Sequence, residues 1–217
     1  MKKLIRFLFV VSLSTAAFTS CNDTDGPDIN EIRLRNDQYA DSILSVEKPK
    51  IEAYVQANLI NAVEDTTKYP FEVLNKQVKR GIWYEILSQP TDDSYEYKLN
   101  ATQTNVVYPT WKLKYSVKLL TSDTPVFSDT EGSTYSLTSN DNNNIFTYAW
   151  LVAFFPARYS LNGSFIPYVG LTEKGLKKGS KIKLVVPSIY AYGSTGLSGK
   201  VPANSPLVYE FEVLDIQ

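Results

Sequence analysis

The chain contains no histidine and a single cysteine among its 217 residues. Without histidine it cannot build a Ser-His-Asp or Cys-His catalytic site, nor a metal site that uses imidazole ligands. One cysteine allows neither an intramolecular disulfide nor a thiolate metal cluster. An excess of one charge is also missing, because 22 Lys and Arg balance 23 Asp and Glu. We therefore expect no metal, no cofactor and no nucleic-acid partner.

Long apolar runs are missing as well, and the two runs that stand out are too short to cross a bilayer. The first, at residues 7–17, follows Lys2, Lys3 and Arg6 and precedes small residues. This pattern is typical of a secretory signal. The second, at 145–156, ends in a proline and predicts a buried strand, with a membrane-facing or partner-facing loop as the alternative.

The single cysteine, Cys21, follows the small pair Thr19 and Ser20 directly after the signal-like segment. This arrangement resembles a bacterial lipobox, although Phe18 stands where such boxes usually carry leucine. The resemblance implies a signal peptide at 1–20, cleavage before Cys21 and diacylglycerol on its thiol. The protein would then be an outer-membrane lipoprotein of the bacterial cell envelope, facing the periplasm or the outside, and attached through its lipid anchor only. The alternative is an ordinary signal peptide with a chance cysteine.

An N-terminal appendage is expected before the main domain. Residues 21–35 are largely polar and turn-rich in their first part, which predicts a lipidated, flexible tether. Apolar residues then recur every three or four positions, which predicts a helical segment at 36–77, capped by Asn36 or Asp37 and kinked or split at Pro49. Its apolar side could pack on the main domain or on a second copy, so a homodimer through these helices is left open. We expect this segment to be dispensable for the C-terminal fold.

The remainder of the chain alternates between apolar and polar residues with period two, which is typical of half-buried antiparallel strands. The clearest case is 111–120, which places one tryptophan, one tyrosine and aliphatic residues on one face and lysines on the other. A short helix is predicted at 171–178. The other predicted strands lie at 81–87, 95–99, 181–186 and 207–216. The fold class is therefore α+β, a twisted antiparallel β-sheet with a short helix packed on it, preceded by the N-terminal helical segment.

A continuous string of motifs fills residues 170–216. It contains a strand ending in proline, the turn Tyr-Ala-Tyr-Gly at 190–193, a glycine-rich loop, a Val-Pro step at 201–202 and a final alternating strand. In this order the motifs resemble the FKBP-type peptidyl-prolyl cis-trans isomerases. Weaker similarity upstream makes 78–217 an FKBP-like domain with an insertion near 130–155.

The resemblance implies a dry aromatic pocket for a proline-containing polypeptide. Its catalytic residues would be Tyr192, Ile166 and Tyr209. The hydroxyl of Tyr192 would donate to the ligand, and the backbone N–H of Ile166 would bind the substrate carbonyl. Tyr209 would form part of the apolar wall near the prolyl ring. The substrate-binding residues that it implies are Tyr115, Phe127, Phe165, Leu171 and Val201. Such a pocket favours the twisted amide over the planar one, so it needs neither a nucleophile nor an acid.

The site departs from the family pattern at two places. The family usually carries Asp directly after the loop aromatic, whereas this chain has Ser128 there and Asp129 one position later. The floor of the pocket is often Trp in the family, and the matching positions here are Val169 and Leu171. Both departures predict weak activity.

Three functions remain open on the sequence alone. The first is an envelope peptidyl-prolyl isomerase and chaperone that acts weakly on exported polypeptides. The second is a non-catalytic FKBP-like lipoprotein that binds a peptide or a protein partner. The third is a β-sandwich lipoprotein whose aromatic residues stack on glycans, under which the Tyr-Ala-Tyr-Gly string has no explanation. Whether the protein is an enzyme is therefore left open.

Overall fold

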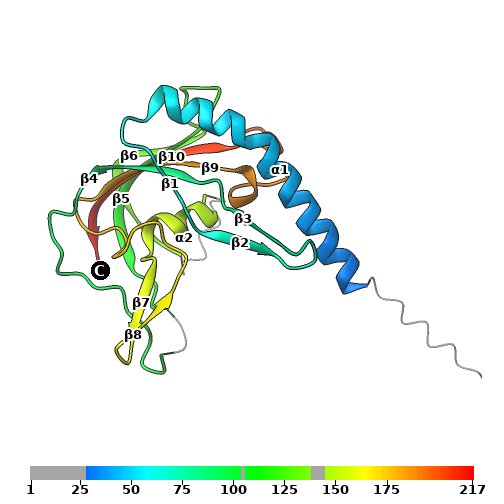
Figure 1. The fold of residues 1–217 in the computed structure, drawn as a ribbon. Coiled ribbons are helices and arrows are strands. Elements are labelled where there is room, and N and C mark those ends of the chain that lie inside the picture. The colour runs from blue at the N-terminus through cyan, green and yellow to red at the C-terminus, as the bar shows by residue number, and fades with distance from the viewer. Residues whose placement is uncertain (1–27, 104–105, 138–144) are drawn as a thin grey trace, which may run out of the picture.

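The computed structural model describes residues 28–103, 106–137 and 145–217, so the predicted signal peptide and Cys21 lie outside the described residues. Figure 1 shows a curved sheet with the long helix α1 across one face and the short helix α2 against the other. The elements in chain order are α1 (Ile29–Asn58), β1 (Val63–Glu64), β2 (Lys68–Phe71), β3 (Lys76–Lys79), β4 (Trp83–Ser88), β5 (Thr110–Leu119), β6 (Phe127–Ser136), α2 (Tyr148–Phe154), β7 (Arg158–Leu161), β8 (Ser164–Pro167), β9 (Lys181–Val186), the 3-10 helix η1 (Ser188–Tyr190) and β10 (Leu207–Ile216).

The main sheet has six strands in the order β1-β4-β9-β10-β5-β6, and every neighbouring pair is antiparallel. The last strand of the chain, β10, lies inside the sheet between β9 and β5. The alternation of apolar and polar residues along β5 explains which of its side chains are buried. Trp111, Leu113 and Val117 are at most 1% exposed, while the lysines between them face outward. The predicted α+β class, with a short helix on an antiparallel sheet and an N-terminal helix, is confirmed.

The N-terminal helix is longer at its start and shorter at its end than the sequence predicted. Asp28 caps α1, since its Oδ1 accepts the N–H of Asn30 at 2.9 Å. Residues 29–35, predicted as tether, are therefore helical, and Asn36 and Asp37 lie inside the helix. The helix continues through Pro49 and bends near its middle, so the predicted kink is present and the split is not (Figure 1).

The C-terminal half of α1 packs on the main sheet. Ile51 and Val55 are 1% and 4% exposed and form a cluster with Val185 of β9 and Val208 of β10. These two valines point to the sheet face opposite α2, so the sheet is covered on both sides. This packing argues against the expectation that the helical segment is dispensable for the C-terminal fold.

The short helix is not where it was predicted. Residues 148–154 form α2 instead of a buried strand, and Ala149, Trp150 and Ala153 are fully buried. A helix enclosed on all sides is apolar all round and shows no period, so the run resembles a strand in sequence. Residues 171–178 form turns, because Gly175 has φ +73 and a Cβ there would lie 2.5 Å from the Tyr97 ring.

The strand predicted at 95–99 is also wrong. Both edges of β4 are already occupied, by β1 and by β9, so no edge remains for a hairpin partner after it. Tyr97 instead packs its ring 5.5 Å from that of Phe155 and donates its hydroxyl to the carbonyl of Leu176 at 2.7 Å. The segment therefore links the sheet to the loops near α2.

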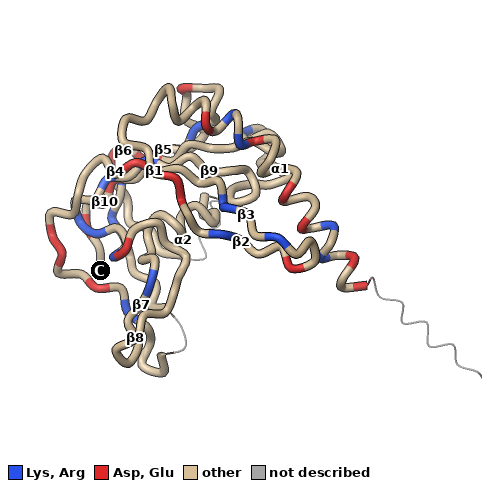
Figure 2. Tube along the Cα trace, viewed as in Figure 1, with Lys and Arg blue, Asp and Glu red and all other residues tan. Residues whose placement is uncertain are grey.

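Charged residues of both signs alternate along the trace, and Figure 2 shows no element that carries one sign only along a long stretch. Within the described ranges, no helix is long and apolar enough to cross a membrane. The same part of the chain holds no group of three acidic or thiol side chains that could bind a metal ion.

Candidate functional site

Most of the predicted site residues meet on the α2 side of the sheet. Six of the eight belong to one hydrophobic cluster, although they come from β5, β6, β10 and two loops. Their gathering explains why residues far apart in sequence carry the family resemblance. The six are Tyr115, Phe127, Leu171, Tyr192, Val201 and Tyr209.

Tyr192 lies in the loop after η1 and stacks on Phe127 at the start of β6. The two ring centroids are 6.2 Å apart and the rings are inclined by 26°. The ammonium of Lys200 lies 4.3 Å from the centroid of the Phe127 ring. Burial raises the pKa of Tyr192 to about 12, so its hydroxyl keeps its proton at neutral pH and can act as a donor.

The glycine-rich loop folds back tightly beside this pair. Leu197 and Val201 exchange two backbone hydrogen bonds of 2.7 and 2.8 Å. Gly196 has φ +65, and a Cβ at this position would lie 2.4 Å from the carbonyl oxygen of Val201. Only glycine allows this close approach, which brings Val201 back to the cluster.

Tyr209 is a wall residue that is shared with the core. It is fully buried on β10, and its ring stacks on that of Phe211 with centroids 5.8 Å apart. Its hydroxyl lies 3.0 Å from the Oγ1 of Thr147, at the start of α2. Burial raises the pKa of Tyr209, so this hydroxyl is neutral across the physiological range.

Trp150, which α2 brings to the same cluster, was not among the predicted site residues. Its ring centroid lies 5.4 Å from that of Tyr115 and 4.8 Å from that of Phe211. Its buried Nε1 has no hydrogen-bond partner among the described residues. A tryptophan therefore does contact the predicted pocket residues, supplied by another segment than the one that carries Val169 and Leu171. The sequence feature that could have identified this residue is a tryptophan within the apolar run 145–156, which we predicted to be a strand.

Phe165 and Ile166 are not part of this cluster. Both lie on β8, in the β7–β8 hairpin that projects from one end of the molecule (Figure 1), and they are 65% and 41% exposed. The guanidinium of Arg158 covers the Phe165 ring at 3.9 Å. The predicted backbone donor at Ile166 is thus placed outside the cluster that contains Tyr192.

Asp129 carries the carboxylate at the edge of the cluster, whereas Ser128 is exposed. Asp129 is the register partner of Tyr115 and accepts the hydroxyl of Tyr135 at 2.7 Å. It also accepts the backbone N–H groups of Gly132 and Ser133, both at 2.8 Å. The Tyr135 bond is the main cause that lowers the pKa of Asp129. A one-residue shift therefore keeps an ionised carboxylate beside the aromatic rings.

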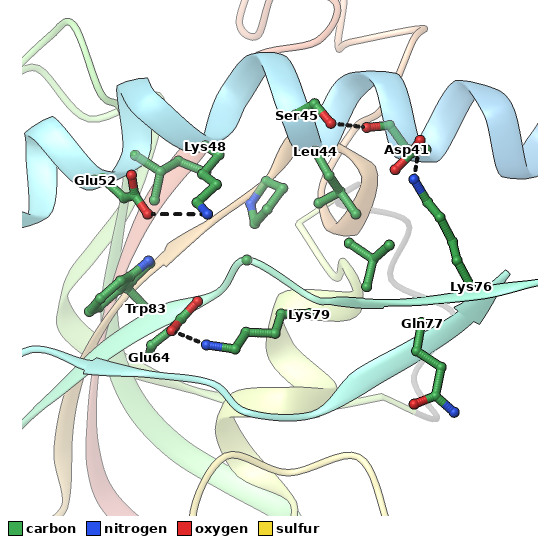
Figure 3. Close-up of a pocket in the computed structure, with 14 residues that line it drawn as sticks. Asp41, Leu44, Ser45, Lys48, Glu52, Glu64, Lys76, Gln77, Lys79 and Trp83 are labelled. Carbon is green, nitrogen blue, oxygen red and sulfur yellow. Dashed lines mark hydrogen bonds and ion pairs between the residues drawn. The ribbon is translucent and has the colours of Figure 1, made fainter.

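A separate cavity of about 470 Å³ lies between α1 and the β2–β3 hairpin. Figure 3 shows ion pairs along it, Lys76 with Asp41, Lys79 with Glu64 and Lys48 with Glu52. Its walls include Leu44, Ile51, Trp83 and Pro187. Because its charges neutralise one another in pairs and none of the predicted site residues lines it, we assign it no catalytic role.

Comparison with known proteins places the similarity in the C-terminal region. The family model of FKBP-type peptidyl-prolyl cis-trans isomerase matches residues 155–214. The FKBP-type peptidyl-prolyl cis-trans isomerase FkpA of Escherichia coli (strain K12) is 48% identical over 64 residues, which cover 29% of this chain and 22% of FkpA. FkpA of Buchnera aphidicola subsp. Baizongia pistaciae is 50% identical over 64 residues, 29% of this chain and 24% of its own length. The matched region thus spans less than a quarter of either relative.

Two solved structures are similar to the chain as well. A peptidyl-prolyl cis-trans isomerase of Pseudomonas syringae pv. tomato covers 89% of this chain and 98% of its own, with 16% identity and a TM-score of 0.43. AtFKBP13 covers 63% of this chain and 94% of its own, with 16% identity and a TM-score of 0.42. The sequence match over 155–214, which contains Tyr192, Val201 and Tyr209, shows that the C-terminal region of the chain is similar to the FKBP-type peptidyl-prolyl cis-trans isomerase family.

Proposed function

We propose that the protein is a peptidyl-prolyl cis-trans isomerase with chaperone character that acts weakly on exported, proline-containing polypeptides. The observation that carries the proposal is the stacking of Tyr192 on Phe127 within the cluster that also holds Tyr209 and Val201. Three of these four residues lie in the region that matches the isomerase family.

The reaction needs neither a nucleophile nor an acid, so a chain without histidine can catalyse it. Resonance gives the X-Pro bond a rotation barrier of about 18–20 kcal/mol, and the twisted amide separates less charge than the planar one. An aromatic, water-poor surface favours the twisted form, and the neutral Tyr192 hydroxyl supplies a donor. Lowering the barrier by ~8 kcal/mol accelerates rotation about a million-fold.

We expect the activity to be weak because one expected contact is displaced. The backbone of Ile166 lies on the exposed hairpin β7–β8 instead of in the aromatic cluster. A missing hydrogen bond to the reacting chain costs about 0.5–1.5 kcal/mol, and more when a charged group is involved. Turnover should therefore lie about two- to tenfold below that of a complete FKBP site.

Protease-coupled isomerisation of a short X-Pro peptide tests this function on a soluble chain of residues 22–217, which lacks Cys21 and therefore its lipid. We expect measurable catalysis that falls about tenfold in Tyr192→Phe, because the substitution removes one donor and leaves the ring stack. Tyr69→Phe is the matched control, since Tyr69 lies on β2 and is 49% exposed. Catalysis that Tyr192→Phe leaves unchanged would show that the site lies elsewhere.

A non-catalytic binding function is the second candidate. It is favoured by the exposed Phe165 and Ile166 on β8, which offer an apolar surface away from the aromatic cluster. Under this function the chain would delay the aggregation of a proline-containing unfolded polypeptide without accelerating X-Pro rotation, and Phe165→Ser would weaken that effect while Tyr192→Phe would not.

We also propose that the protein is a lipoprotein of the bacterial cell envelope, anchored through Cys21. The support is the basic start, the short apolar run and the position of the one cysteine directly after it. The mass of the native N-terminal peptide should correspond to a chain that begins with a diacylated Cys21. A mature chain that begins elsewhere, or with a free thiol, would contradict the anchor.

A further inference from the structure

Glu47 is a buried carboxylate on α1 that the proposed chemistry does not use. It is 1% exposed, although it lies on a helix whose other acidic side chains reach solvent. Burial raises the pKa of Glu47, whereas its hydrogen bonds to Ser188 lower it. Within the described ranges no cation forms an ion pair with it, so the hydrogen bonds to Ser188 are its main compensation and the charge of Lys50 adds a smaller one.

Both carboxylate oxygens of Glu47 bind Ser188, which lies in η1 just before the loop that carries Tyr192. Oε2 accepts the backbone N–H of Ser188 at 2.8 Å, and Oε1 accepts its hydroxyl at 2.5 Å. Ser188 is the first residue of η1, and the residue before it, Pro187, provides no side-chain cap. A residue 141 positions earlier in the chain therefore fixes the start of η1.

Ser188 in turn fixes both neighbours of Tyr192. Its carbonyl accepts the N–H of Ala191 at 2.9 Å and the N–H of Gly193 at 2.8 Å. The backbone on either side of Tyr192 is thus bonded to the residue that Glu47 binds. A second tie from α1 reaches the far end of the loop, where the hydroxyl of Tyr39 donates to the Oδ1 of Asn204 at 2.7 Å.

We propose that Glu47 is a positioning residue that holds Ser188, and through it the backbone of Tyr192, in the geometry that stacks Tyr192 on Phe127. Only the expected effect of Glu47 on catalysis rests on the proposed isomerase function. The positional effect itself follows from the hydrogen bonds. The N-terminal helix is then a part of the isomerase site and not an appendage to it.

The test compares Glu47→Leu, which keeps much of the volume but removes both acceptors, with Glu47→Gln, which can accept the Ser188 N–H and donate to its hydroxyl. We expect amide exchange at Ala191 and Gly193 to accelerate about tenfold in Glu47→Leu and to stay near wild type in Glu47→Gln. Amides of β9 and β10 are the internal reference. Glu52→Gln is the matched control, since Glu52 lies on the same helix, is partly exposed and pairs with Lys48.

Catalysis gives the second readout. We expect kcat for an X-Pro peptide to fall about tenfold in Glu47→Leu, with KM little changed and with rescue in Glu47→Gln. Ser188→Ala removes only the hydroxyl bond and should show a smaller effect in the same direction. Unchanged exchange at Ala191 and Gly193 in Glu47→Leu, or equal acceleration in β9 and β10, overturns the positioning role. If the wild-type chain shows no isomerisation, the proposed function fails, and the exchange data still decide the role of Glu47.

Discussion

A chain that begins at residue 60 will not unfold cooperatively, because it lacks α1. The truncation removes Leu44, Ile51 and Val55, which are 6%, 1% and 4% exposed. Full burial of one such side chain contributes about 1.5–3 kcal/mol, so three contribute about 5–9 kcal/mol. It also removes the two hydrogen bonds from Ser188 to the carboxylate of Glu47, whose net contribution is about 1.5–3 kcal/mol each. A domain of this size is stable by only about 5–15 kcal/mol.

Urea unfolding followed by far-UV circular dichroism checks this expectation. The matched control is a chain that begins at residue 28, which keeps the Asp28 cap and all of α1 and should unfold like the mature protein. A cooperative transition of the shorter chain, at a urea midpoint close to that of the control, would show that α1 is an appendage after all.

The central strands could be predicted from the sequence because their alternation records their burial directly. β9 and β10 have the bounds that the pattern predicts, and β5 is shifted by one residue. Strand β9 also contains a pattern from which a second layer on the sheet could have been predicted. Leu184, Val185 and Val186 are all buried, and a strand that is apolar on both faces indicates a second covering layer. That layer is α1.

The position of the short helix could not be predicted by the same reasoning. Residues 145–156 have no period because the environment of α2 is apolar on all sides, so strand and helix fit them equally. The predicted helix at 171–178 failed for the opposite reason. Its spacing suits a helix, but Gly175 at φ +73 and the carbonyl of Phe154, which accepts the N–H of Leu176 at 2.9 Å, require turns.

The candidate site was predictable where it depends on local motifs and not where it depends on the path of the chain. The Tyr-Ala-Tyr-Gly turn and the Val-Pro step place Tyr192 and Val201 in the cluster as expected. Ile166 was assigned by its position in a motif, and the β7–β8 hairpin carries it away from Tyr192. Whether these residues act in catalysis stays a prediction.

Trp150→Ala will cost about 3–5 kcal/mol of the free energy of unfolding, the range for removing a large buried aromatic side chain. Trp150 is fully buried, and its ring lies 4.9 Å from that of Phe146, 5.5 Å from that of Phe154 and 5.8 Å from that of Tyr135, centroid to centroid. Because several rings share one central neighbour, no single shift can fill the cavity that is left. The loss should therefore lie toward the upper end of the range.

Trp83→Ala deletes the same atoms at a site where the structure predicts a smaller loss. Trp83 is only partly buried, lies on β4 beneath α1 and lines the cavity of Figure 3, so water can occupy the space that its ring leaves. We expect a cost of about 1–2 kcal/mol there, with urea unfolding as the measurement for both variants. Equal losses would mean that the aromatic cluster around α2 is no better packed than the surface of the sheet. In that case the cluster could not hold Tyr115 and Tyr209 rigidly enough to form the wall of a prolyl pocket.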